Sequence, residues 1–218
     1  MHWLDRNEHC HSCHSSWAAI GATIRGMKIE ILLFDGFDDL DAFGPFEVLT
    51  GAGFDTRFVT IEPRETVRSS HGATIVVEGV LGDPDLVVIP GGGWNDRETG
   101  GVYLEARRGV IPEALRRRHE AGRRIASVCT GAMMLAEAGI LKGRPAITHH
   151  SAIEDLKGFG VDVQEGARFV DDGDIMTAAG VTSGIDLALH IVRTTLGEDA
   201  ARAEAAEVEW NQAVSTPA

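Results

Sequence analysis

Apolar residues along the chain follow two kinds of pattern. Short continuous apolar runs, typical of buried strands, alternate with longer segments in which apolar residues recur every three or four positions, as in amphipathic helices. The runs are residues 28–34, 56–61, 85–89 and 124–129. The helical patterns are residues 38–50, 110–121, 184–192 and 199–210. Strands that alternate with helices predict an α/β fold, with a mostly parallel central sheet covered by helices on both faces.

Turn-forming residues add detail to this outline. The pair Asp172-Gly173 separates two apolar segments and predicts a hairpin over residues 169–177. Residues 67–77 predict a second, shorter hairpin. Pro45 lies inside the first helical pattern and lacks the amide hydrogen that a helix interior needs. We therefore expect that helix to break, or to begin, near Pro45.

Residues 1–26 show neither pattern. They contain two of the three cysteines, Cys10 and Cys13, within the segment 9–14 (HCHSCH), whose side chains are of the types that bind zinc. A structural zinc site normally takes its ligand pairs from two separated segments, and the sequence has no second cysteine pair. We therefore expect an extension outside the fold, either disordered or produced by a start assigned upstream of Met27.

Composition and charge narrow the class of protein. The chain has 218 residues, of which 44% are hydrophobic and 24% charged, and we expect a single domain over residues 27–218. The formal net charge of -13 argues against nucleic acid or an anionic membrane as a partner. No apolar run approaches the ~20 residues that a membrane span needs. With few cysteines and no secretory signal pattern, we expect a cytoplasmic protein.

The most informative motif is the segment 124–132 (RIASVCTGA), in which an apolar run ends on Cys129 and a helical pattern begins. A cysteine at this turn lies at a helix N-terminus, where unpaired N–H groups and the helix dipole favour the thiolate. Gly131 and Ala132 are small enough to permit a sharp turn. The alternative is a buried, unreactive cysteine, because free cysteine is often fully buried.

Other chemically useful residues follow the remaining strands. In open α/β sheets, sites form beyond the carboxyl ends of the strands. Four segments have that placement: residues 35–41, 90–93, 129–130 and 148–150. The sequence therefore predicts that a carboxylate, a thiol, backbone donors and imidazole groups meet at one edge of the sheet.

Six motifs, in order along the chain, resemble those of the ThiJ/PfpI superfamily, within the class I glutamine amidotransferase-like group. They are residues 40–45 (LDAFGP), 89–92 (IPGG), 127–131 (SVCTG), 139–144 (GILKGR), 148–149 (TH) and 179–186 (AGVTSGID). The isocyanide hydratase branch is the most similar. The resemblance implies a flavodoxin-like three-layer sandwich and a homodimer, without metal or organic cofactor.

By matched position, the resemblance implies Cys129 as the nucleophile, Asp41 as the acid and Thr130 beside the nucleophile. The proteolytic branch has histidine where this chain has Thr130, so a protease triad is not expected. His149 matches a histidine that lies near the cysteine in deglycase-like relatives. Isocyanide hydratases usually have tryptophan at the next position, where this chain has His150.

The residue types themselves support an acid–nucleophile pair. A carboxylate beside a thiolate is unfavourable, so one of the two groups keeps a proton. If the helix terminus favours the thiolate, the proton resides on Asp41 and its pKa is raised. Cys129 would then attack the terminal carbon of an isocyanide to give a thioimidate, with Asp41 as general acid. Asp41, once ionised, would activate water, and backbone N–H groups at Gly91, Gly92 and Thr130 would hold the intermediate.

Two other functions remain open for a small-molecule substrate at this site. One is a glyoxalase- or deglycase-like activity on reactive carbonyl compounds that uses Cys129, Asp41 and His149. The other is a non-enzymatic sensor of a ligand or oxidant, in which Cys129 is reversibly oxidised.

His150 is included with His149 as a substrate-binding residue. We expect structural roles for His71, His119, His190 and Asp186, and leave open whether Trp210 covers the pocket or a dimer interface.

Overall fold

The computed structural model describes residues 26–95, 97 and 100–211. Its centre is a six-stranded sheet with the order β2-β1-β5-β6-β10-β9. The strands are β1 (Lys28–Leu32), β2 (Asp55–Val59), β5 (Leu86–Ile89), β6 (Arg124–Val128), β9 (Phe169–Asp171) and β10 (Ile175–Ala178). All neighbours are parallel except β9 and β10, which pair antiparallel. The expected mostly parallel sheet is confirmed.

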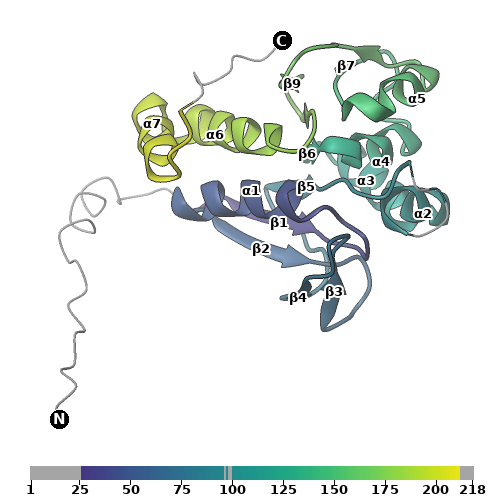
Figure 1. Cartoon of the computed structure of the whole chain (residues 1–218), viewed down its shortest axis with the longest axis horizontal. Helices are drawn as coiled ribbons and strands as arrows, with labels where there is room; N and C mark the ends of the chain where they lie inside the picture. The colour runs from purple at the N-terminus through teal and green to yellow at the C-terminus, as the bar shows by residue number, and fades with distance from the viewer. Residues whose placement is uncertain (1–25, 96, 98–99, 212–218) are drawn as a thin grey trace.

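Helices cover both faces of this sheet, which gives the expected three-layer sandwich (Figure 1). One face carries α1 (Asp39–Gly51), α6 (Ser183–Leu196) and α7 (Glu198–Glu207). The other carries α2 (Gly101–Arg108), α3 (Val110–Glu120) and α4 (Ala132–Glu137). Because both faces are covered, β5 is buried along its whole length, which explains its continuous apolar sequence.

Smaller elements lie outside the sandwich. The hairpin β3 (Thr66–Arg68) and β4 (Thr74–Val76) forms as expected, and so does the hairpin of β9 and β10. A two-stranded sheet, β7 (Pro145–Ala146) and β8 (Asp162–Val163), flanks the short helix α5 (Ile153–Gly158). The 3-10 turn η2 (Cys129–Gly131) follows β6, and the 3-10 turn η3 (His150–Ala152) precedes α5.

The expected break at Pro45 is wrong, because α1 runs continuously through this residue. A β-carbon placed on Gly184 of α6 would lie 3.2 Å from Pro45 Cγ, so the proline ring packs closely against that glycine. A β-carbon on Gly44 would likewise lie 3.2 Å from Ile185 Cγ1. Close packing of α1 on α6 therefore compensates for the one hydrogen bond that proline removes.

Some sequence expectations fall outside the described residues. These are the ones about the N-terminal extension, including Cys10 and Cys13. Within the described residues, no group of three or more His, Cys, Asp or Glu side chains is arranged to hold a metal ion. No helix in the same part of the chain is long and apolar enough to cross a membrane.

Candidate active site

Cys129 occupies a strained turn between β6 and η2. Its φ angle is 58°, in the left-handed region that residues other than glycine rarely adopt and that destabilises the backbone by roughly 1–3 kcal/mol. The turn is held at both backbone groups: Cys129 N–H donates to the Ala179 carbonyl (3.0 Å), and the Thr148 hydroxyl donates to the Cys129 carbonyl (2.9 Å). Only 6% of the cysteine is exposed. The geometry is that of a nucleophile presented on a sharp strand-to-helix turn.

Gly131 lets this turn lie directly against the end of β5. A β-carbon at this position would approach the Ile89 carbonyl oxygen to 2.3 Å and the Pro90 carbonyl oxygen to 2.9 Å. Any larger residue would therefore push the Cys129 turn away from the loop that follows β5. The segments after β5 and β6 meet at the sheet edge where the sequence places them.

Asp41 lies in the first turn of α1 and is completely buried. Its Oδ2 accepts a hydrogen bond from the Gly91 N–H (3.1 Å), and the Gly92 N–H donates to the Thr130 hydroxyl oxygen (3.0 Å). A β-carbon on Gly91 would lie 2.6 Å from Thr130 N and 2.9 Å from Asp41 Oδ2. One glycine loop therefore positions both the acid and the residue beside the nucleophile.

The second oxygen of Asp41 has a different environment. Oδ1 is buried and has no hydrogen-bond partner among the described residues. A buried polar atom without a partner is unfavourable, so such an atom beside a reactive side chain is a natural contact for a bound molecule. Burial raises the pKa of Asp41 to about 8, and the nearby charge of Asp38 acts in the same direction. Hydrogen bonds with the Cys129 thiol and the Gly91 N–H oppose this rise. The raised pKa agrees with the sequence-based expectation.

The thiol behaves differently from the expectation. Burial raises the pKa of Cys129, and the negative charge of Asp41 raises it further, against a hydrogen bond from the Thr130 N–H. The helix that follows is short, a 3-10 turn and the six residues of α4, and its dipole does not outweigh desolvation. At neutral pH the thiol therefore keeps its proton, and Asp41 is mostly protonated.

His149 is half-buried and directly follows Thr148, whose hydroxyl holds the Cys129 carbonyl. Its ring packs on Gly180, where a β-carbon would come within 2.0 Å of His149 Cδ2. Nδ1 accepts the Ser151 N–H (3.3 Å) and lies 2.7 Å from the Ser151 hydroxyl oxygen. Burial and the neighbouring His150 lower the pKa of His149. The neutral ring therefore carries its hydrogen on Nε2, which no described residue engages.

His150 differs from its neighbour. It is exposed, and its ring lies over that of His149 with the centroids 4.1 Å apart. Of the two histidines, His149 is the one packed against the backbone that holds Cys129, because Gly180 directly follows Ala179, the acceptor of the Cys129 N–H.

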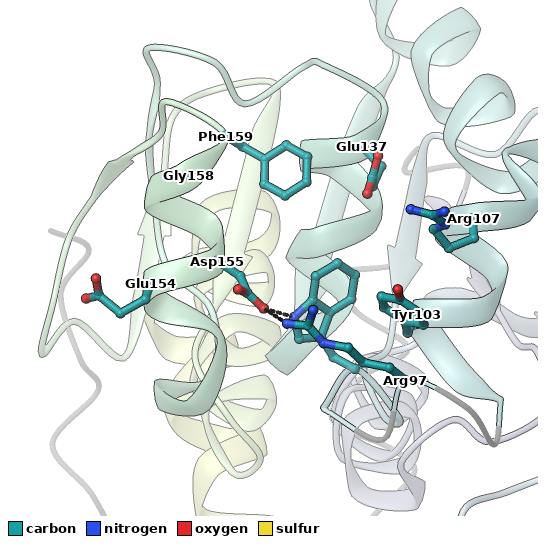
Figure 2. A pocket seen from close by; sticks show the side chains of 9 residues that line it. Arg97, Tyr103, Arg107, Glu137, Glu154, Asp155, Gly158 and Phe159 are labelled. Atoms are coloured by element: carbon teal, nitrogen blue, oxygen red, sulfur yellow. Dashed lines mark hydrogen bonds and ion pairs between the residues drawn. The ribbon is translucent and has the colours of Figure 1, made fainter.

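A set of contacts that the sequence does not predict joins the glycine loop to the histidine segment. The Trp94 indole N–H donates to Asp155 Oδ2 (2.6 Å), and Asn95 Nδ2 donates to the Ser151 hydroxyl oxygen (2.7 Å). Arg97 forms an ion pair with the same Asp155 carboxylate (3.2 Å), as Figure 2 shows. The one feature of the sequence that points to these contacts is the position of Trp94 directly after three glycines.

A pocket of ≈ 340 Å³ is lined in part by the residues of these contacts, Trp94, Arg97 and Asp155 (Figure 2). Aromatic rings of Trp94, Tyr103 and Phe159 and the charged groups of Arg107 and Glu137 are among its lining residues. Neither Cys129 nor Asp41 lines it. The pocket is therefore a separate hollow, adjacent to the segments that carry the candidate site.

The remaining polar residues noted in the sequence have structural partners. His190 is buried and its Nε2 lies 2.6 Å from Asp171 Oδ2. Asp186 is buried, forms an ion pair with Arg168 and accepts the Trp210 indole N–H (3.2 Å). Trp210 therefore contacts the N-terminal turn of α6.

Comparisons with known proteins give a consistent result. A family model described as the DJ-1/PfpI family matches residues 27–194. An isonitrile hydratase of Pseudomonas putida is 29% identical over 188 residues, which cover 84% of this chain and 78% of that protein. A deglycase of Thermococcus kodakarensis is 31% identical over 153 residues, which cover 68% of this chain and 87% of that protein.

Solved structures support the same fold. A ThiJ/PfpI family protein from Pseudomonas syringae has a TM-score of 0.71 at 27% identity, over 86% of this chain and 76% of that one. Drosophila melanogaster DJ-1beta has a TM-score of 0.74 at 21% identity, over 84% of this chain and 98% of that one. A likeness at this low identity shows only that the two proteins share a fold. The similar sequences thus include enzymes with two different activities, and the similar solved structures share the fold of this chain.

Proposed function

The chain belongs to the DJ-1/PfpI family, and we propose that it is an isocyanide hydratase that converts an isocyanide into an N-substituted formamide. The observation that carries this proposal is the fully buried carboxyl group of Asp41, which the Gly91 N–H holds on the same loop that orients Thr130, next to Cys129. Burial raises the pKa of Asp41 to about 8, which favours its protonated form at neutral pH. Hydration of an isocyanide requires a proton at the same carbon that a nucleophile attacks. A neutral carboxylic acid next to a thiol supplies both.

In the first step, Cys129 Sγ forms a bond to the terminal carbon of the isocyanide, and Asp41 gives its proton to that carbon. The thiol proton passes to the Asp41 carboxylate. The net change is addition of S–H across one carbon, which gives a thioimidate and leaves Asp41 protonated again. The geometry of the glycine loop supports this relay, because a β-carbon on Gly91 would lie within 3 Å of both Asp41 Oδ2 and the N atom of Thr130, the residue after Cys129.

In the second step, Asp41 protonates the thioimidate nitrogen and then accepts a proton from the attacking water. The resulting tetrahedral carbon carries a hydroxyl group, the amine nitrogen and sulfur. Its carbon–sulfur bond breaks, the hydroxyl proton returns through Asp41 to sulfur, and the formamide leaves. Cys129 and Asp41 end the cycle in their starting states, so no metal or organic cofactor takes part.

The neighbouring groups have supporting roles in this proposal. Gly91 orients Asp41 through its N–H, and Gly92 orients the Thr130 hydroxyl. Thr130 contributes to the placement of water, and the neutral His149 donates from Nε2 to a polar group of the substrate. His150 is exposed and would contact the substrate as it enters.

We further propose that the protein acts in the cytoplasm as a homodimer on a small molecule, with neither nucleic acid nor membrane as a partner. The resemblance to the isocyanide hydratase branch supports the dimer. The formal net charge of -13 supports the exclusion of polyanionic partners.

A second activity also has a specific observation in its favour. The relatives include deglycases, and His149 packs beside the backbone that holds Cys129. A site that acts on carbonyl compounds would use such a histidine next to the nucleophile. A non-enzymatic oxidant sensor is less favoured, because the thiolate is the form that peroxide oxidises and the Cys129 pKa is raised.

The test is a comparison of substrate classes with one protein preparation. We expect the wild type to form the N-substituted formamide from a simple alkyl isocyanide, and Cys129→Ala to form none. Conversion of a 2-oxoaldehyde to a 2-hydroxy acid, without isocyanide turnover, would replace the hydratase with the carbonyl activity. A wild type that has neither activity, and whose Cys129 is readily oxidised by peroxide, would favour the sensor.

A further inference from the structure

Thr148 is the first residue of the histidine segment and is 1% exposed. Its hydroxyl donates to the carbonyl oxygen of Cys129 over 2.9 Å, although the two residues are 19 positions apart. The bond therefore joins the segment after β7 to the turn after β6. No other described side chain donates to the backbone of Cys129.

The Cys129 turn requires such a contact. Its positive φ is unfavourable for cysteine, so the surrounding structure must hold it. The Ala179 carbonyl fixes the N–H side of the residue, and Thr148 fixes the carbonyl side. Release of the carbonyl would let the turn relax toward an ordinary backbone conformation and would move Sγ relative to Asp41.

We propose that Thr148 is a positioning residue that holds the strained Cys129 turn so that the sulfur faces Asp41. The effect on turnover rests on the hydratase activity proposed above, whereas the effect on the thiol does not. In this role Thr148 touches neither substrate nor sulfur. It acts through the backbone carbonyl of the nucleophile.

A nearby threonine provides a matched control. Thr177 on β10 is also 1% exposed, and its hydroxyl oxygen accepts a hydrogen bond from the Ile147 N–H (2.9 Å). The Thr177 hydroxyl thus holds the backbone at Ile147, and the Thr148 hydroxyl belongs to the next residue of the same segment. Only the Thr148 hydroxyl reaches Cys129.

The experiment compares Thr148→Val, Thr148→Ala, Thr148→Ser and Thr177→Val. Valine keeps the shape of threonine without the hydroxyl, and serine keeps the hydroxyl. Two quantities are measured at pH 8: the rate of Cys129 alkylation by iodoacetamide, followed by mass spectrometry, and kcat for a simple alkyl isocyanide. Thermal unfolding of each variant identifies those that remain folded, and Thr148→Ala provides a second hydroxyl-free variant if the valine variant is unfolded.

We expect the hydroxyl-free Thr148 variants to alkylate at least threefold faster, because sulfur moves away from the Asp41 charge. Their kcat falls at least tenfold with little change in KM, while Thr148→Ser and Thr177→Val remain near wild type. Equal effects in Thr177→Val and Thr148→Val would overturn the proposal, because loss of stability would then explain both. Unchanged alkylation in folded Thr148→Val would also overturn it, even if the wild type did not hydrate isocyanides.

Discussion

The backbone N–H of Gly91 donates to Oδ2 of Asp41 over 3.1 Å, across 50 positions of sequence. The next N–H in the loop, at Gly92, holds the Thr130 hydroxyl. The acid and the residue after the nucleophile are therefore oriented by adjacent amides of one loop. Preorganised contacts of this kind set reactive groups before substrate arrives.

Gly91→Ala should damage this arrangement directly. The added β-carbon would lie 2.6 Å from Thr130 N and 2.9 Å from Asp41 Oδ2, so one of these groups must move. We expect kcat/KM to fall at least ~100-fold, as when a positioned acid is lost. Gly158→Ala is the control, because a β-carbon there meets no atom within 4 Å. Equal activity of Gly91→Ala and Gly158→Ala would contradict the assigned role of the loop.

Asp41 should make stability depend on pH. Its pKa is about 8 in the folded protein and roughly 3.9 in the unfolded chain, so the folded state binds the extra proton between these values. The stability that this group contributes is present below about pH 4 and is lost as the pH rises toward 8. The loss approaches ~1.4 kcal/mol per pH unit.

Urea unfolding of wild type and Asp41→Asn at pH 5, 6 and 7.5 measures this dependence. We expect the free energy of unfolding to fall with pH more steeply in the wild type than in Asp41→Asn, which cannot ionise. Asp162→Asn, which replaces an exposed carboxyl group, should run parallel to the wild type. Parallel curves for wild type and Asp41→Asn would show that Asp41 ionises normally.

The Ser151 contacts should fix the tautomer of His149. Because the Ser151 N–H donates to Nδ1, the neutral ring should carry its hydrogen on Nε2. Long-range ¹H–¹⁵N NMR distinguishes the two tautomers. Ser151→Ala removes the hydroxyl that lies 2.7 Å from Nδ1 and should increase the Nδ1–H population, with His150 as the internal reference. A wild-type His149 that already carries its hydrogen on Nδ1 would contradict this assignment.

The position of the site could be predicted from the sequence because parallel strands place their carboxyl ends at one sheet edge. Cys129, Asp41 and the glycine loop meet there for that reason. The bond between Trp94 and Asp155 could not be predicted, because it joins two loops whose separation depends on the whole fold.

Other misses have equally specific causes. The helices α2 and α5 have only eight and six residues, too few for a helical period to repeat in the sequence. The continuity of α1 through Pro45 depends on contact with Gly184 of another helix. The raised pKa of Cys129 depends on the depth of burial, which a local motif does not encode.

The most direct test of the central claim is the rate of formamide formation from a simple alkyl isocyanide at pH 7, for wild type, Cys129→Ala and Asp41→Asn. We expect turnover by the wild type, none by Cys129→Ala, and a loss of at least ~100-fold in Asp41→Asn, the usual range for a general acid. Wild-type activity in Asp41→Asn, or no formamide from the wild type, would contradict a Cys129–Asp41 hydratase.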